Sequence, residues 1–469
     1  MLRGGMHKRI SPSPSGSVAS IQADSDSALA RRYTVQLCDD LKLAAPAILN
    51  VPDEHPATAW ARSGLMALTG DDRPQLCIAP IVSAAQGAMS LLRAMAPDGG
   101  LDDLDAATLL GERAALMGST RAGATSPGGA CHLLAVADGW LAVNLARDDD
   151  WTLLSAWLET EDVPSFDALK TMVASRSTAD LVERARWLGL AVAPEQPPIS
   201  APWCRVIAGM PWQGQAQRPA RRPRVVDLSS LWAGPLCSHL LHRLGAEVIK
   251  VEGWQRPDGA RRGNADFFNL LHAGKQCVAL DWGTPTGLAQ LRALLASADI
   301  IIEGSRPRAL QQLDIDAAAM VAARPGLTWV SLTGYGRSDP EADWVAFGDD
   351  AGVAAGLSRL MREQTGRSLM VGDALADPIT GLHAALAAWA SWCEGGSRLL
   401  SLSLVDTLRH AIGFELPASA TARRERHAQW GEWLQQQGLS AMPPQARRPY
   451  DVALSLGADN AAVLGALPC

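Results

Sequence analysis

Residues 224–252 read RVVDLSSLWAGPLCSHLLHRLGAEVIKVE. The opening run RVVDLS is short and β-branched, which is typical of a buried strand. The turn that follows places Pro235 near the start of a helical stretch, PLCSHLLHRL, which we expect to end at Gly245. AEVIKVE then predicts another strand. The segment therefore predicts a strand–helix–strand unit.

The same alternation continues downstream. CVALD (277–281), DIIIEG (299–304) and LTWVSLTG (327–334) predict strands, and the segments between them predict helices. Short apolar strands separated by amphipathic helices favour an α/β fold, with a doubly wound parallel sheet in a Rossmann-like large domain and a ligand crevice at the carboxyl ends of the strands. LWAGP stands where a dinucleotide-binding protein would carry GxGxxG, so the main support for an NAD site is missing. A helix N-terminus can still bind an anion there.

Composition excludes several classes of function. The 469 residues correspond to about two to four domain-sized units, and 48% of them are apolar. A net charge of −7 speaks against nonspecific nucleic-acid binding. The eight cysteines have no metal-ligand spacing, which predicts reduced thiols and no metal site. No apolar run has the length of a membrane span, and the N-terminus has no secretory h-region, so we expect a cytoplasmic protein without membrane contact.

Changes of pattern divide the chain. A hairpin is expected around Asp138-Gly139 within an α+β region, and the segment before Arg224 is rich in Pro, Arg, Gln and Gly. The predicted units are a disordered tail (1–30), a region with a smaller α+β domain (31–195), a linker (196–223), the Rossmann-like catalytic domain (224–413) and a helical C-terminal segment (414–469).

Several motifs in the same order carry a family resemblance. The opening stretch is followed by FFNLLHAGKQCVALDWGTPTGLAQLRALLASADIIIEGSRPRAL (267–310), VSLTGYG (330–336) and ALADPITGLHAALAAWASW (374–392). With their spacing they resemble the class III CoA-transferases of the CaiB/BaiF type, which include formyl-CoA and carnitine CoA-transferases. The resemblance runs from about Arg224 to about Gly413. It implies a Rossmann-like large domain with a smaller domain, and chains that interlock as dimers.

The resemblance also implies a nucleophile. The family motif small-Leu-small-Asp-x-x-x-Gly is matched by Ala374 to Gly381, which makes Asp377 the catalytic carboxylate. Transfer of CoA between an acyl-CoA and a small carboxylic acid then proceeds through an aspartyl anhydride and an aspartyl-CoA thioester, for which a carboxylate is suited. No cofactor is bound permanently, since CoA is part of the substrate. The structural alternative for Asp377 is a helix N-cap before Pro378, and for Asp373 a loop or capping carboxylate.

Residues that contact CoA follow from the same resemblance. They are Ser230, Leu231, Trp232, Ala233, Arg262, Leu280, Gly304, Ser305, Gly334 and Tyr335. This chain lacks some usual family residues, since Gly304-Ser305 stands in place of Asn-Phe. Nearby cations can compensate, namely Arg256, Arg261, Arg262, Arg306 and Arg308.

Two other functions stay open. The family includes α-methylacyl-CoA racemases, which pair the aspartate with a histidine in a Gly-His-Asp motif; here Asp349 replaces that histidine, and His383 is a poor substitute that we expect to be packed. Loss of cationic CoA contacts also allows a catalytically weak pseudoenzyme or scaffold.

The N-terminal half resembles other parts of the same family in rearranged order. ADGWLAVNLARDDDWTLLSAWLE and RSTADLVERARWLGLAVAP resemble its small domain, and residues 61–89 resemble a second catalytic-loop region. Aligning Gly87 with Gly381 places Ser83 on Asp377, so the copy at 77–89 contains no acid. Without a base nearby, we expect a structural role for Ser83. The assembly is then a homodimer or an internal pseudo-dimer.

Overall fold

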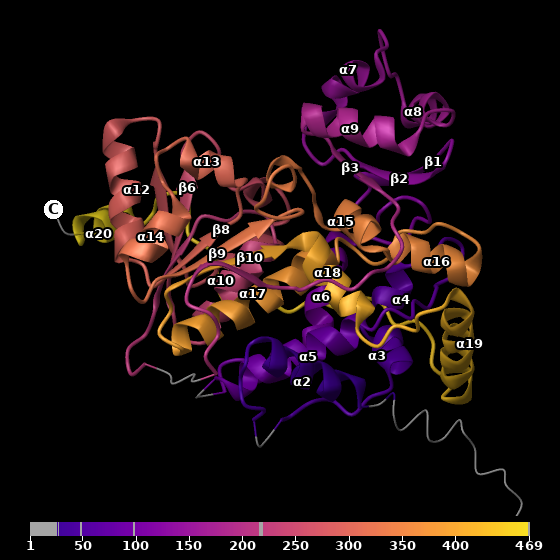
Figure 1. Ribbon diagram of the computed structural model, residues 1–469, viewed down its shortest axis with the longest axis horizontal. Coiled ribbons are helices and arrows are strands. Elements are labelled where there is room, and N and C mark those ends of the chain that lie inside the picture. Colours follow the sequence, from indigo (N-terminus) through magenta and orange to yellow (C-terminus); the bar gives the residue numbers. More distant parts are fainter. Residues whose placement is uncertain (1–25, 27, 47–48, 97–98, 215–218, 468–469) are drawn as a thin grey trace, which may run out of the picture.

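The computed structural model describes residues 26, 28–46, 49–96, 99–214 and 219–467. Seven strands form one sheet in the order β4-β10-β9-β8-β5-β6-β7 (Figure 1). Their bounds are β4 Arg205–Gly209, β5 Arg224–Asp227, β6 Glu247–Gly253, β7 Gln276–Leu280, β8 Ile300–Glu303, β9 Thr328–Thr333 and β10 Arg398–Ser403. All neighbouring pairs are parallel except β4 and β10, which are antiparallel.

Helices cover both faces of this sheet, because successive residues of a strand point to opposite sides. Val225 of β5 belongs to a core with one group of helices, and Val226 to a core with another. The first group includes α10 Ala233–Arg243, α17 Ala376–Cys393 and α18 Leu404–Gly413; the second includes α12 Pro285–Ser297, α14 Ala317–Ala323 and α20 Asn460–Gly465. The predicted doubly wound α/β architecture is confirmed.

A smaller α+β unit lies to one side of the large sheet (Figure 1). It has an antiparallel sheet of β1 Cys131–Val136, β2 Gly139–Asn144 and β3 Ala191–Pro194. Its helices are α7 Leu154–Leu158, α8 Phe166–Val173 and α9 Thr178–Leu188, and it has its own apolar core. The expected hairpin forms, since Val136 pairs with Gly139 across the turn. Ser177 caps α9 and Gly189 ends it with a positive φ of 70°.

The N-terminal helices pack against the large unit rather than forming a separate core. They are α2 Leu29–Asp40, α3 Pro56–Arg62, α4 Leu65–Leu68, α5 Ile81–Ala94 and α6 Ala106–Met117. Tyr33 of α2 and Trp389 of α17 belong to one continuous core. The Tyr33 hydroxyl lies 2.7 Å from Nε2 of His383, in the middle of α17. The N-terminal helices are therefore part of the structural support of α17.

Two helix pairs repeat the same close approach. A Cβ atom on Gly381 of α17 would lie 2.6 Å from the carbonyl oxygen of Ala233, the first residue of α10. A Cβ atom on Gly87 of α5 would lie 2.6 Å from the carbonyl oxygen of Ala30, the second residue of α2. Only a residue without a side chain fits either contact. The alignment of Gly87 with Gly381 stays a prediction, and this shared geometry is consistent with it.

The segment predicted as a linker, 196–223, contains more structure than its composition indicates. β4 lies within it and pairs with β10 at the edge of the sheet. Trp203 is buried beside it. The sequence hides this strand because residues of an edge strand alternate between exposed and half-buried, so no continuous apolar run marks it. The domain boundaries themselves stay predictions.

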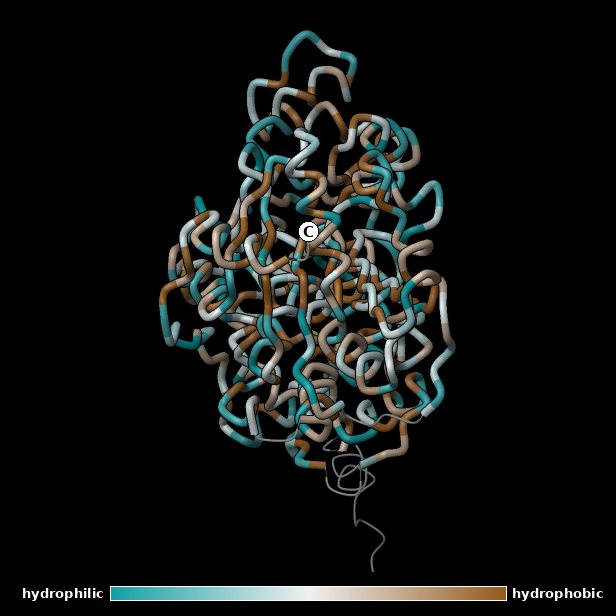
Figure 2. The backbone as a smooth tube through the Cα atoms, turned by 90° about the vertical axis from the view of Figure 1, so that its left-hand side faces the viewer, coloured by the Kyte–Doolittle hydropathy of each residue, from teal (hydrophilic) through white to brown (hydrophobic). Residues whose placement is uncertain are grey.

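The two ends of the chain differ from expectation in part. Most of the predicted tail 1–30 lies outside the described residues, but α2 already begins at Leu29. The C-terminal segment is helical in α19 Ala420–Gln436 and α20, whereas residues 439–455 between them have no helix. In Figure 2 many of the peripheral loops are hydrophilic, and hydrophobic segments run through the interior. Within the described residues, no helix is both long and apolar enough to cross a membrane.

Candidate active site

A cleft of about 1620 Å³ opens beyond the carboxyl ends of the parallel strands. One wall comes from the large unit, through the loops after β5, β6 and β8 and the segment before α15 Gly348–Ala355. The other wall comes from the N-terminal half, through α6, the end of β2 and the end of α9. Asp377 and Asp349 lie among the lining residues. The cleft is thus built jointly by segments far apart in the sequence.

Asp377 is the second residue of α17. The residue before that helix is Leu375, so the N-cap interpretation of Asp377 is wrong. Its carboxylate instead accepts a hydrogen bond from the backbone N–H of Ala233, at the N-terminus of α10. Burial raises the pKa of Asp377 to about 7; the charges of Asp349 and Asp373 raise it further, whereas Arg113 and this hydrogen bond lower it. The carboxylate is therefore a weaker acid than an exposed aspartate.

Gly348, the first residue of α15, fixes the position of that carboxylate. A Cβ atom on Gly348 would lie 2.2 Å from Oδ2 of Asp377 and 2.4 Å from the carbonyl oxygen of Ala374. No side chain fits in this space. Asp377 consequently lies directly against the backbone at the start of α15.

A buried ion pair lies next to the nucleophile candidate. Arg113 of α6 donates from Nε to Oδ2 of Asp373 at 2.9 Å, and its guanidinium lies 5.4 Å from the ring centre of Trp232. Asp373 lies in the turn before α17 and is a partner of Arg113, which agrees with the loop alternative of the expectation. Asp349 accepts from the N–H of Ala374 at 2.8 Å, and burial raises its pKa to about 6.

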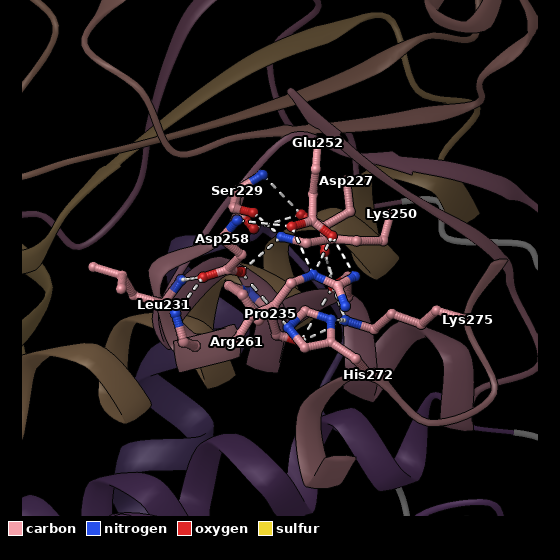
Figure 3. Close-up of polar contacts among 12 residues, drawn as sticks. Asp227, Ser229, Leu231, Pro235, Lys250, Glu252, Asp258, Arg261, His272 and Lys275 are labelled. Carbon is pink, nitrogen blue, oxygen red and sulfur yellow. Dashed lines mark hydrogen bonds and ion pairs between the residues drawn. The ribbon is translucent and has the colours of Figure 1, made fainter. Parts of the chain in front are cut away.

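Beneath the β5–α10 loop lies a network of buried charges (Figure 3). Lys250 of β6 donates to Asp258 at 2.9 Å and also to the carbonyl of Ser229. The other oxygen of Asp258 accepts from the N–H of Leu231 at 3.0 Å, which holds Leu231 at a positive φ of 71°. The network therefore fixes the loop that presents the N–H of Ala233 to Asp377.

This network was not predicted from the sequence. One signal was available: lysine is rare in this chain, and Lys250 interrupts the apolar strand of AEVIKVE. The second buried lysine, Lys275, donates to the carbonyl of Pro235 at 3.0 Å, so it binds the first turn of α10.

The residues that the resemblance assigns to CoA separate into three groups. Leu231, Trp232 and Arg262 line the cleft. Others lie beside it: Ser230 is exposed next to Leu231, Ala233 faces Asp377, and Gly304-Ser305 directly precede Arg306. Three lie outside its lining. Leu280 is buried, and Tyr335 lines a separate smaller pocket. Gly334 packs so closely that a Cβ atom on it would lie 2.8 Å from Cβ of Ala346.

Four of the five candidate arginines line the cleft: Arg256, Arg262, Arg306 and Arg308. Arg261 does not, because it pairs with Glu252 at 2.6 Å. Arg306 and Arg256 have no ion pair within the described part of the chain. Burial, and then the charges of the neighbouring arginines, lower the pKa of Arg306. Such a cluster of cations suits a ligand with several negative charges.

His383 is buried and lies outside the cleft. Its Nδ1 contacts the carbonyl of Ile379 at 2.8 Å, and burial lowers its pKa to about 3. The expectation of a packed residue agrees with this geometry. Within the described residues there is no group of three or more His, Cys, Asp or Glu side chains placed to hold a metal ion.

Comparison with known proteins decides the family. The model described as CoA-transferase family III matches residues 223–458. The chain belongs to this family. Asp377, Asp349, Gly348 and the cleft arginines Arg256 to Arg308 lie within the matched range. Arg113, Asn144 and Arg186 of the cleft lie before it.

Individual relatives of this CoA-transferase family III chain are similar over part of their length. A succinate–glutarate CoA-transferase of Agrobacterium fabrum is 29% identical over 210 residues, which are 40% of this chain and 52% of the relative. A succinyl-CoA–D-citramalate CoA-transferase of Chloroflexus aurantiacus is 28% identical over 200 residues, which are 40% and 50% of the two chains. The chain thus spans about half the length of the curated relatives it matches.

Solved structures resemble the chain more weakly. Rv3272 from Mycobacterium tuberculosis is 28% identical, with a TM-score of 0.38 over 42% of this chain and 58% of that one. A CaiB/BaiF family protein from Brucella suis is 24% identical, with a TM-score of 0.37 over 49% and 60% of the chains. Superpositions at this level do not bear on the geometry of the site.

Proposed function

We propose that this family III chain transfers coenzyme A from an acyl-CoA to a small carboxylic acid, with Asp377 as the nucleophile. The observation that carries the proposal is the position of this carboxylate. It lies in the cleft at the start of α17, is poorly hydrated, and faces the N–H of Ala233 at the start of another helix. Poor hydration makes a carboxylate more reactive, and N–H groups at a helix N-terminus stabilise an oxyanion.

The reaction takes four acyl transfers. An oxygen of Asp377 attacks the thioester carbonyl, which forms a mixed anhydride and releases the CoA thiolate. The thiolate attacks the aspartyl carbonyl, which gives an aspartyl-CoA thioester and frees the donor acid. The acceptor carboxylate attacks that thioester and releases the thiolate again. The thiolate then attacks the acyl carbonyl of the new anhydride, so that the product acyl-CoA forms and Asp377 is regenerated.

The arginine cluster provides the binding site for the phosphates of CoA. Its members Arg256, Arg262, Arg306 and Arg308 line the same cleft as Asp377, and Arg147 adds a cation from the opposite wall. Phosphate groups accept charge-assisted hydrogen bonds from guanidinium groups, so each such contact contributes about 1.5–3 kcal/mol. Leu231 and Trp232 supply apolar surface to the same cleft. CoA enters and leaves as part of the substrate.

The N-terminal half acts as a built-in second copy. It supplies Arg113, Asn144 and Arg186 to the cleft, all from before the family match. Ser83 is buried in α5 and is not among the cleft residues, so we assign it to packing. An internal pseudo-dimer of this kind completes the site within one chain. Relatives named for succinate, glutarate and D-citramalate support a small organic acid as acceptor.

The test is an exchange assay with matched variants. Wild-type protein and the variants Asp377→Asn, Asp377→Ala and Ser83→Ala are incubated with succinyl-CoA and a panel of short carboxylic acids, and new acyl-CoA is separated by chromatography. We expect transfer by the wild type and by S83A, and none by D377N or D377A. Transfer by D377A would refute the proposal. Exchange of the α-proton in D₂O without any transfer would instead indicate a racemase, and absence of both activities with no CoA binding would indicate a scaffold.

A further inference from the structure

Arg186 lies in the last turn of α9, where the small unit faces the large one. It lines the catalytic cleft and also a second, smaller cavity of about 450 Å³. Its guanidinium carbon lies 3.3 Å from the ring centre of Trp344 and 5.9 Å from that of Tyr335. Trp344 lines both cavities too. Arg186 and Trp344 therefore form the wall between the two cavities.

No carboxylate of the described residues forms an ion pair with Arg186. Its buried Nε also has no hydrogen-bond acceptor there. The side chain is only half exposed, and burial is the main reason why its pKa lies below the usual value; the charges of Tyr335 and Glu341 act in the opposite direction. Because a partly buried cation without a counter-ion is unfavourable, this position suits an anion supplied from outside.

Other arginines of the cleft behave differently. Four of them have a carboxylate oxygen within 4 Å of the guanidinium: at 2.5 Å for Arg113, 2.5 Å for Arg147, 3.6 Å for Arg262 and 3.2 Å for Arg308. Arg306 and Arg256 have none in the described chain, but Arg306 lies in the field of the neighbouring arginines and Arg256 is exposed to solvent. Arg186 is outside that cluster, since no arginine contributes to its pKa. One guanidinium stacked on an indole matches the single charge and planar shape of a carboxylate.

We propose that Arg186 binds the second carboxylate of a dicarboxylic acid whose first carboxylate reacts at Asp377. This inference rests on the proposed CoA transfer and names the class of acid. Trp344 precedes Gly348 by four residues, and Gly348 abuts Asp377. Arg186 and Asp377 line the same cleft, and Trp344, on which Arg186 stacks, lies there as well.

The test compares two acceptor acids of equal carbon number, glutarate and valerate. Wild type, Arg186→Met, Arg186→Lys and the control Arg359→Met are assayed with succinyl-CoA. Arg359 lies on α16 Leu357–Thr365, pairs with Glu363 and does not line either cavity. We expect R186M to lower kcat/KM for glutarate about 10- to 100-fold and to leave valerate unchanged, with partial recovery in R186K. The control should match the wild type. An equal loss for both acids, or no loss, would overturn the proposal.

A binding measurement separates this inference from the proposed function. Glutarate is titrated into each protein by calorimetry without acyl-CoA. If the wild type binds glutarate but transfers CoA to no acid, and R186M abolishes the binding, Arg186 is a carboxylate-binding residue but the proposed function fails, and with it the reaction of the first carboxylate at Asp377. If CoA transfer occurs but R186M treats glutarate and valerate alike, the function stands and the inference fails. If the wild type neither binds glutarate nor transfers CoA to it, the assignment of Arg186 is wrong.

Discussion

Asp350 and Asn144 join the two walls of the cleft through a contact that requires a proton. Asp350 lies in the first turn of α15 and is fully buried. Its Oδ1 accepts from Nδ2 of Asn144 at 2.8 Å and from the N–H of Phe347 at 2.9 Å. The remaining oxygens of the two side chains, Asp350 Oδ2 and Asn144 Oδ1, are buried without a donor among the described residues. A proton on Oδ2 supplies that donor, and burial raises the pKa of Asp350 to about 7.

The sign of the pH effect follows from linkage. The pKa of Asp350 rises from 3.8 to about 7 on folding, so between these values the native state holds a proton that the unfolded state has released. Stability therefore falls as the pH rises through this range. The difference of about 3 pH units corresponds to about 4 kcal/mol of unfolding free energy at pH 8.

The exchange Asp350→Asn tests this value. An asparagine at this position carries its own donor at every pH, so D350N should be more stable than the wild type at pH 8 by about 2–4 kcal/mol. At pH 5 most of this advantage should disappear. The assay is urea unfolding of both proteins at the two pH values, with the exposed exchange Asp266→Asn as control. A D350N protein that is less stable at pH 8, or one whose advantage does not depend on pH, would show that Asp350 is not protonated in the native state.

Two further predictions concern the surroundings of Asp377. Gly348→Ala places a methyl group 2.2 Å from Oδ2 of Asp377, so CoA transfer measured by chromatography should fall at least about 100-fold. The control Gly352→Ala lies in the same helix, has its nearest neighbour at 3.4 Å, and should retain activity. Equal activity of the two variants would contradict this geometry. The rate of transfer should fall as the pH decreases below about 7, because only the ionised carboxylate of Asp377 is nucleophilic. Arg113 lowers the pKa of Asp377, so Arg113→Met should move this limb of the pH profile to higher pH. A limb that stays at the same pH would show that Arg113 does not act on the nucleophile.

The sequence predicts the parallel sheet well because each strand is a short apolar run between amphipathic helices. One of the helices expected between these strands is α12, which Thr284 caps and Pro285 begins. β4 could not be predicted in the same way, since the side chains of an edge strand are only half covered. Local patterns therefore identify elements that are buried on both faces and miss those whose partner comes from a distant segment.

The same distinction between local sequence patterns and distant partners holds for the residues of the active site. Asp377 is marked by its motif, and Asp349 by standing where the racemase motif of the family has its histidine. Arg113 is not, because its pairing with Asp373 joins residues 260 positions apart. Arg186 has no local pattern either, since its role depends on Trp344 of another unit. Residues that complete a site across an interface carry no signal in their own neighbourhood.

The central claim is a covalent bond between Asp377 and CoA. Wild-type protein is incubated with succinyl-CoA, digested at mildly acidic pH, and the peptide that contains Asp377 is analysed by mass spectrometry with and without hydroxylamine. We predict a CoA adduct on Asp377, converted by hydroxylamine to an aspartyl hydroxamate, and neither product in D377N. Transfer activity in the same sample without either modification at Asp377, or with the modification on another residue, would contradict this claim.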